Sequence, residues 1–198
     1  MHPTSLRTGS AGEHALQQLH GTRERAERFY RQQVRAALNG RMREFLARQE
    51  MMFVATSDAS GACDSTFRAG PPGFVRCLDP GTLAWPEYRG NGVMASLGNI
   101  SENGHVGLLF VDFVRDGIGL HVNGGAEIVS DGYLRAEYPD LPADPASGRR
   151  AEQWVLVRVD EAYVHCAKHI PRLAKAAPEE GSRRGSGDYF GTRTDPSS

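Results

Sequence analysis

Lysine is nearly absent from this 198-residue chain, in which 21 of the 23 cationic side chains are arginine. The two lysines, Lys168 and Lys175, lie toward the C-terminal end. A phosphate held by a cationic side chain within the first 167 residues must therefore be held by arginine. The planar guanidinium group of arginine can form two parallel hydrogen bonds to such an anion.

The sequence also lacks the features of several protein classes. No apolar run approaches the roughly 20 residues that a membrane-spanning helix needs, and the first twenty residues carry no apolar signal-peptide core. The three cysteines form no C-x-x-C pair, which argues against a disulfide framework or a zinc ribbon. A net charge of −1 provides no basic field for nucleic acid. We expect a soluble cytoplasmic protein that binds neither membranes nor nucleic acid.

The length suits one ordinary domain with tails. Residues 1–20 form a polar lead-in, and residues 21–175 carry the periodic patterns of a folded domain with N-terminal helices. Residues 176–198 are rich in glycine, serine and arginine and are expected to form a flexible tail.

Short β segments dominate the folded region after Met51. A series of them at regular spacing, with a few helices at the edges, predicts a mainly β, α+β fold built on a small barrel. A small closed barrel fills its own interior, so a ligand is expected outside it, between the barrel and a partner. The predicted helices are 22–38 (ending at Asn39-Gly40), 42–46, 93–100 and 131–138. The predicted strands are 51–56, 63–67, 74–78, 82–85, 105–113, 118–122, 126–129, 154–159 and 162–166. Gly124-Gly125 is expected to form a turn, and residues 139–150 a proline-rich loop.

The chemistry is concentrated between residues 63 and 110. Ser65 and Arg68 come at the end of one strand, before a stiff Gly-Pro-Pro-Gly bend at 70–73. The segment Arg89-Gly90-Asn91-Gly92 precedes a predicted helix. Backbone N–H groups at a helix start, glycines and nearby arginines together form a phosphate cradle. Two aromatic residues beside it, Trp85 and Tyr88, are candidates to flank a flat ring system.

The order of elements from Met51 to Val129 resembles the flavin-binding split β-barrel of the pyridoxamine 5'-phosphate oxidase superfamily. The resemblance covers about residues 12–175 and points to an oxidase-related branch of FMN-dependent proteins. The motifs that carry it are Phe-Arg-Ala-Gly-Pro-Pro-Gly-Phe-Val-Arg (67–76), Tyr-Arg-Gly-Asn (88–91), Asn-Ile-Ser-Glu-Asn-Gly-His-Val-Gly-Leu-Leu-Phe (99–110), Gly-Thr-x-x-Arg-Ala-x-x-Phe-Tyr (21–30) and Tyr-Val-His-Cys-Ala-Lys-His (163–169).

This resemblance implies a homodimer of split barrels with FMN bound at each end of the interface. Arg68 would pair with the FMN phosphate, and Arg89 with Asn91 would add donors at the helix start. Trp85-Pro86 would lie along the ring, mainly through backbone and van der Waals contact. Further candidates that the resemblance supplies are Val75, Arg76, Ser96 and Asn99.

The sequence departs from true pyridoxamine phosphate oxidases in two places. The strand that holds the FMN phosphate in those enzymes carries a lysine, whereas this chain has the Gly-Pro-Pro-Gly insertion and no lysine there. The Arg-His substrate motif at the end of those enzymes is replaced here by an Arg/Gly/Ser tail. Pyridoxamine phosphate is therefore not the expected substrate.

Residues 163–169 leave several readings open. His165 and Cys166 face opposite sides of a strand, so a metal site is not expected. The segment either packs at a strand end, or Lys168 or His169 reaches the flavin of the second subunit. A cation there would stabilise reduced, anionic FMN. The three cysteines are interpreted as small buried residues.

Four functions are consistent with these patterns. The first is an FMN-dependent oxidoreductase that acts on a small substrate, in which the cofactor performs the redox step. The second is a flavin-binding protein without turnover. The third keeps the barrel and binds a deazaflavin or haem instead, and the fourth is a dimeric scaffold without a cofactor.

Overall fold

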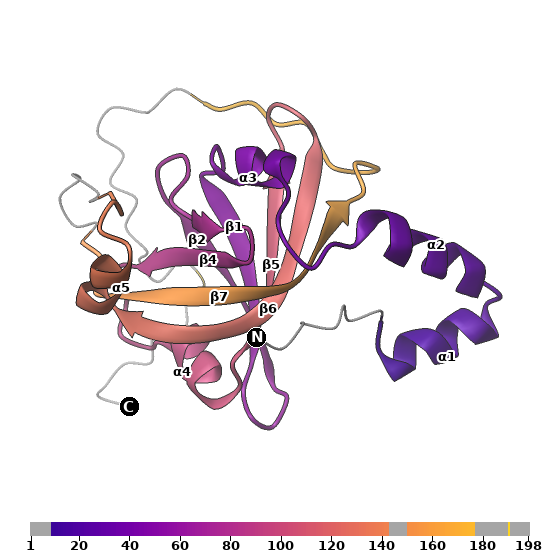
Figure 1. Ribbon diagram of the computed structural model, residues 1–198, viewed down its shortest axis with the longest axis horizontal. Helices are drawn as coiled ribbons and strands as arrows, with labels where there is room; N and C mark the ends of the chain where they lie inside the picture. The colour runs from indigo at the N-terminus through magenta and orange to yellow at the C-terminus, as the bar shows by residue number, and fades with distance from the viewer. Residues whose placement is uncertain (1–8, 143–149, 177–189, 191–198) are drawn as a thin grey trace.

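The structure, a computed structural model, describes residues 9–142, 150–176 and 190. It is built on a seven-stranded antiparallel sheet with flanking helices (Figure 1). The elements are α1 (Ala11–Leu19), α2 (Arg23–Gln33), α3 (Gly40–Leu46), β1 (Met51–Ser57), β2 (Cys63–Ala69), β3 (Arg76–Asp79), β4 (Thr82–Glu87), α4 (Ala95–Glu102), β5 (His105–Asp112), β6 (Ile118–Ser130), α5 (Asp131–Glu137) and β7 (Gln153–His165).

The strands follow the order β2-β1-β5-β6-β7-β4-β3, and each paired neighbour is antiparallel. The two edge strands, β2 and β3, are not hydrogen-bonded to each other within the described residues, so the sheet curls without closing. This open seam is the split of a split barrel. The α+β fold class predicted from the sequence is confirmed, whereas a fully closed barrel is not what forms.

Alternating side chains along the strands build the core. In β1, Met52 and Val54 are buried while Phe53 and Ala55 face outward, as a half-buried strand requires. The strand β4 is buried on both faces: Leu83 and Trp85 enter the barrel core, and Ala84 packs into a second cluster with α5. The end of β4 at Glu87, where the following loop begins, is therefore held in a fixed position.

Two predicted strand pairs are single long strands in the structure. The segments predicted at 118–122 and 126–129 form the continuous strand β6, and those at 154–159 and 162–166 form β7. The Gly124-Gly125 pair was expected to turn the chain. Instead, the pairing of β6 with β7 shifts register between Asn123 and Gly124, which marks a bulge that bends both strands without ending them.

The predicted helix end at Asn39-Gly40 is wrong. The helix α2 ends at Gln33 because Val34 is extended and Arg35 forms a β-bridge with Ala162. Asn39 instead caps the start of α3, where its side-chain oxygen accepts a hydrogen bond from the Met42 N–H at 3.0 Å.

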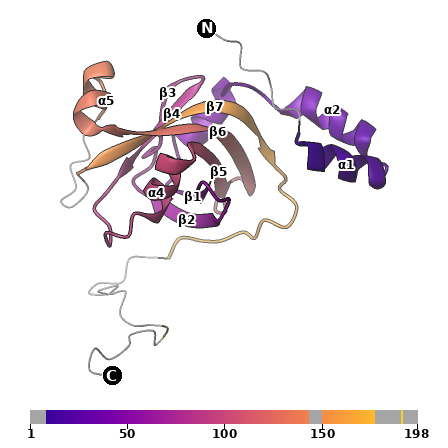
Figure 2. The same cartoon turned by 90° about the horizontal axis from the view of Figure 1, so that it is seen from below.

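Within the polar lead-in, residues 11–19 form the helix α1, which begins with a capping box between Ser10 and Glu13. With α2 it makes a helical hairpin that projects from the side of the sheet (Figures 1 and 2). Most of the tail predicted at 176–198, and part of the loop predicted at 139–150, lie outside the described residues. No helix in the described ranges is both long and apolar enough to cross a membrane.

The bulge predicts a sharp difference between two glycines. A Cβ added to Gly124 would lie 2.0 Å from the Arg158 carbonyl oxygen, whereas one added to Gly132 meets nothing within 4 Å. Gly124→Ala is expected to lower the free energy of unfolding by about 3 kcal/mol. The control Gly132→Ala, in α5, should leave it unchanged or raise it by up to about 1 kcal/mol. Urea denaturation measures both; equal effects would contradict the close packing at the bulge.

Candidate functional site

A groove of about 820 Å³, called the seam groove below, lies beside the open seam of the sheet. Its walls are the inner face of β2, the segment that follows β4 and the start of α4. The lining residues are Asp64, Thr66, Arg68, Glu87, Tyr88, Arg89, Gly90, Asn91, Gly92, Val93, Met94, Ala95, Ser96, Leu97, Glu152 and Gln153.

Arg68 lies on the inner face of β2 with a side chain that is 24% exposed. Its Nε donates to Glu87 Oε1 at 2.8 Å, and its Nη1 donates to Thr66 Oγ1 at 2.9 Å. Among the described contacts, Nη2 makes no hydrogen bond, so this nitrogen can donate to a ligand. The ion pair joins β2 to β4 across the seam where no backbone pairing exists.

Glu87 Oε1 also accepts a second hydrogen bond. Trp85 Nε1 donates to Glu87 Oε1 at 2.7 Å, while the Trp85 side chain, 1% exposed, is part of the barrel core. The indole therefore does not line the groove, and Tyr88 is the aromatic side chain that does. Pro86 is also buried, at the point where β4 pairs with Trp154.

The first turn of α4 supplies backbone N–H groups at the opposite wall. Met94, the N-cap residue, has φ +56° and makes no side-chain capping bond, and Gly92 before it has φ +85°. Asn91 Oδ1 accepts from the Val93 N–H at 3.0 Å and shapes the approach to the helix. A helix start without a side-chain cap retains donors and partial positive charge for an anion.

Carboxylates share the groove with the arginines. Arg68 and Arg89 line it together with Asp64, Glu87 and Glu152. Asp64 lies near α4, where its Oδ2 accepts from the buried Ser96 Oγ at 3.4 Å. The groove therefore combines two guanidinium groups with acceptors for hydroxyl or N–H donors, rather than presenting a uniformly basic surface.

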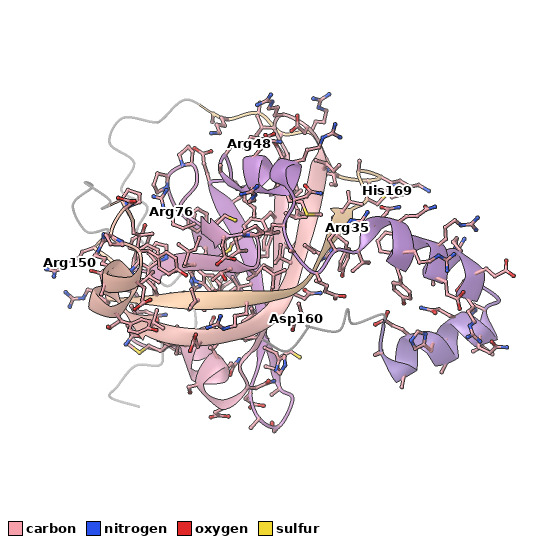
Figure 3. All side chains as sticks on the ribbon, viewed as in Figure 1. Arg35, Arg48, Arg76, Arg150, Asp160 and His169 are labelled. Atoms are coloured by element: carbon pink, nitrogen blue, oxygen red, sulfur yellow. The ribbon has the colours of Figure 1, made fainter. Side chains whose placement is uncertain are left out.

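Other sequence candidates lie away from this groove. Val75 and Arg76 line a different groove, of about 700 Å³, between α3, β3 and the residues after α5. Lys168 follows the far end of β7, whereas Gln153 at the near end lines the seam groove. Figure 3 shows the wide separation between Arg76 and His169, the neighbour of Lys168. One chain alone does not bring these residues together with Arg68.

Ser65, Asn99 and His165 do not line the seam groove either. Ser65 is exposed on the outer face of β2, opposite to Arg68. The Nδ2 atom of Asn99 donates to Thr56 Oγ1 at 3.0 Å and ties α4 to β1. His165 makes a 2.9 Å hydrogen bond through Nδ1 to His121 Nε2, so it is part of a histidine pair on neighbouring strands.

The cysteines do not follow the sequence expectation. Cys63 and Cys166 are exposed and Cys77 is partly buried, so none belongs to the deep core. Burial raises the pKa of the Cys77 thiol, which therefore stays protonated at neutral pH. Across the described part of the chain, no group of three or more His, Cys, Asp or Glu side chains is arranged to hold a metal ion.

Sequence reasoning missed the acidic half of the groove. Asp64, Thr66 and Arg68 alternate along β2 and therefore share its inner face, a period-2 signal that the sequence contains. Glu87 gives no comparable signal. Its role depends on the pairing of β4 within the sheet and on the seam, which bring it next to Arg68.

The chain has counterparts among known proteins. The profile of the pyridoxamine 5'-phosphate oxidase family matches residues 38–166, about two thirds of the chain, and the chain therefore belongs to this family. It has no match among curated proteins.

Three solved structures that resemble this chain carry different names. HupZ from Group A Streptococcus is 24% identical over 64% of this chain and 94% of its own, with a TM-score of 0.49. An F420 reductase is 20% identical over 59% and 90% of the two chains, with a TM-score of 0.39. HutZ, the haem storage protein of Vibrio cholerae, is 12% identical over 62% and 88%, with a TM-score of 0.40.

The shared oxygen of Glu87 predicts a stability effect. Glu87→Leu leaves the buried Trp85 N–H without its acceptor and removes the ion pair of Arg68, so the free energy of unfolding should fall by about 1–3 kcal/mol. In the Glu87→Leu background, Trp85→Phe should recover part of this loss because it removes the unpaired donor. Urea denaturation tests both.

The matched control is Glu127→Leu, because Glu127 pairs with Arg158 through side chains that are 55% and 73% exposed. Its loss should change stability by less than about 1 kcal/mol. An effect of Glu87→Leu no larger than that of this control would mean that the seam does not depend on the shared oxygen.

Proposed function

We propose that the seam groove binds FMN and that the protein is an FMN-dependent oxidoreductase acting on a small substrate. The observation that carries this proposal is the convergence of Arg68, the segment Arg89–Gly92 and the start of α4 around one groove. Membership of the pyridoxamine 5'-phosphate oxidase family supports it. The volume of about 820 Å³ falls within the range of small-molecule sites.

The residues present fit the parts of FMN. The phosphate would accept from Arg68 Nη2, from Arg89 and from the N–H groups of the first turn of α4. Asp64 and Glu152 would accept from ribityl hydroxyls, which are the donors that such carboxylates require. Tyr88 would contact the ring system.

FMN, when bound, supplies the transfer of hydride or single electrons. The chain itself fixes the position of the phosphate and limits the access of water through the walls of the groove. The mixed charge of the groove has a further consequence: Glu87 partly neutralises Arg68, so the site favours a ligand that brings one strongly anionic group and several hydrogen-bond donors.

The outer face of β1 and β2 supports a homodimer with the cofactor at its interface. Phe53 and Phe67 are 38% and 49% exposed and contact each other edge to face with ring centroids 5.7 Å apart. The strand β2 carries Phe67 outward and Arg68 inward. A second copy packed on this outer face would therefore lie at the rim of the groove, where residues of that copy can close it.

Binding of a deazaflavin or haem without redox turnover is the alternative, and the absorption spectrum of the purified protein separates these ligands. A flavin spectrum, together with a released ligand whose mass is that of FMN, would support the proposal. A deazaflavin or haem spectrum would replace FMN, and a protein that neither carries nor takes up FMN would refute it.

Arg68→Met is expected to weaken FMN binding about 10- to 150-fold, because it removes one charge-assisted hydrogen bond to the phosphate. Fluorescence quenching of FMN on titration with the apoprotein measures the change. The control Arg158→Met removes a 73%-exposed arginine on β7 and should leave the affinity unchanged. Arg89→Met leaves the ion pair between Arg68 and Glu87 intact. A weaker affinity for FMN in this variant too would show that the loss does not come from an altered fold. Equal affinity in all variants would rule out the phosphate role.

Phe67→Ser is expected to weaken the dimer because it removes half of the exposed aromatic pair. If the site is shared, FMN release on dilution should then occur at higher protein concentration than in the unaltered protein. Sedimentation velocity and FMN fluorescence over the same dilution series give both quantities. Leu173→Ser, at another exposed apolar residue, is the control. A monomeric variant that retains FMN with full affinity would contradict a shared site.

A further inference from the structure

The groove of about 700 Å³ that contains Arg76 lies at β3, an edge strand of the sheet, and is called the edge groove below. One wall comes from α3 and from the bend at Pro72-Gly73, and the other comes from the end of α5 and the residues after it. The edge groove shares no lining residue with the seam groove. Its volume falls within the range of small-molecule sites.

Arg76 differs from the other arginines that are withdrawn from water. Four arginines are partly buried within the described residues. Three of them form an ion pair with a carboxylate: Arg48 with Asp116, Arg68 with Glu87 and Arg135 with Asp131. The fourth, Arg76, forms no hydrogen bond or ion pair with another described residue. A partly buried cation without a counter-charge is unfavourable, so a bound anion would stabilise it.

The guanidinium group of Arg76 can reach a ligand through its two terminal nitrogens. Its Nε is closed to solvent and has no hydrogen-bond partner, so this atom takes no part in binding. Nη1 and Nη2 are not closed off in this way, and the side chain lines the edge groove. Two terminal N–H groups of one guanidinium match the two oxygens of a carboxylate.

A second guanidinium group comes from the wall that α3 forms. Arg43 is exposed, lines the edge groove and forms no hydrogen bond or ion pair with another described residue. Burial raises the pKa of the Cys77 thiol, and the charge of Arg43 counteracts part of this effect. Arg43 is therefore close to the residue that follows Arg76 on β3. Two unpaired positive charges thus lie at the same groove.

The remaining lining of the edge groove restricts what these arginines can bind. Val75, Leu78 and Leu141 are buried or half-buried and provide apolar surface. Glu137 and Asp140 are exposed, and neither forms an ion pair with another described residue. Their charges repel a dianion more strongly than a monoanion. The lining therefore favours a single carboxylate attached to an apolar group over inorganic phosphate.

We propose that the edge groove binds a small organic monocarboxylate with an apolar body. The carboxylate accepts hydrogen bonds from Nη1 and Nη2 of Arg76, and Arg43 adds a second positive charge. The apolar body packs against Val75 and Leu78 and is withdrawn from water there. This site is separate from the seam groove, so the proposal does not depend on the binding of FMN.

Isothermal titration of the full chain with phenylacetate and with phenylacetamide tests the proposal. The two compounds have nearly the same shape, so the difference between their affinities measures the contribution of the negative charge. Phenylacetate is expected to bind about 10-fold more tightly than phenylacetamide, because its hydrogen bonds to Arg76 are charge-assisted. Hepes buffer is used, so that inorganic phosphate can be titrated separately, and phosphate should bind more weakly than phenylacetate.

Arg76→Met should reduce the affinity for phenylacetate to that for phenylacetamide and leave the affinity for the amide unchanged. The midpoint of urea unfolding should not fall, because this substitution removes a cation that has no partner. Arg43→Met should weaken phenylacetate about 2- to 5-fold, since Arg43 is exposed. The control Arg41→Met removes an exposed arginine of α3 that does not line the edge groove, and it should change neither affinity.

Three results would overturn the proposal: no heat of binding at millimolar phenylacetate, equal affinities for the acid and the amide in the unaltered protein, or a preference for the acid that survives Arg76→Met. A fourth is displacement of phenylacetate by FMN, since the edge groove would then be part of a flavin site. Failure of the protein to bind FMN would refute the function proposed above and would leave the phenylacetate titration unaffected.

Discussion

A single carboxylate oxygen joins the two sides of the open seam. Glu87 Oε1 accepts from Arg68 on β2 and from Trp85 in the barrel core, so it couples an edge strand to the best-buried part of the sheet. Both partners of the ion pair are largely shielded from water, which strengthens their attraction and makes loss of either partner costly. The seam groove depends on this contact because Arg68 is held in place before any ligand arrives.

The rigidity of β4 gives the groove its second fixed wall. This strand is covered on one side by the barrel core and on the other by the cluster around α5, so the segment that leaves it at Glu87 starts from a fixed point. The chain then passes Gly92 and Met94, both with positive φ, before α4 begins. Pre-organised walls reduce the entropy that ligand binding must lose, which favours a tightly held cofactor.

Local sequence patterns identified the part of the site that lies within one stretch of chain. Arg68, Tyr88, Arg89 and Asn91 line one groove because β2 and the start of α4 lie next to each other. The sequence did not distinguish the buried Trp85 from the groove-lining Tyr88, since the barrel core and the cluster around α5 that cover the two faces of β4 are built from residues distant in sequence. Val75, Arg76 and Lys168 do not line this groove. Their contact with a flavin remains a prediction, and only that of Lys168 involves a second subunit.

The fold, too, could be predicted only in part from local sequence patterns. Strand positions followed from alternation, but Gly124-Gly125 and Asn39-Gly40 were misinterpreted because glycine and asparagine serve more than one purpose. A Gly-Gly pair permits a bulge as well as a turn, and an Asn-Gly pair begins a helix as readily as it ends one. Which of these forms depends on partners distant in sequence, such as Arg158 beside Gly124.

The unbroken length of β7 has a further consequence for the grooves at its two ends. This strand contributes Gln153 to the seam groove at one end and Tyr163 to a groove beside α1 and α2 near the other, and β6 pairs with it along nearly its whole course. Ten residues of extended chain span roughly 30 Å. The two ends of the strand are too far apart for direct contact, so any coupling between them must pass along the strand, through the bend where the pairing of β6 and β7 shifts by one residue.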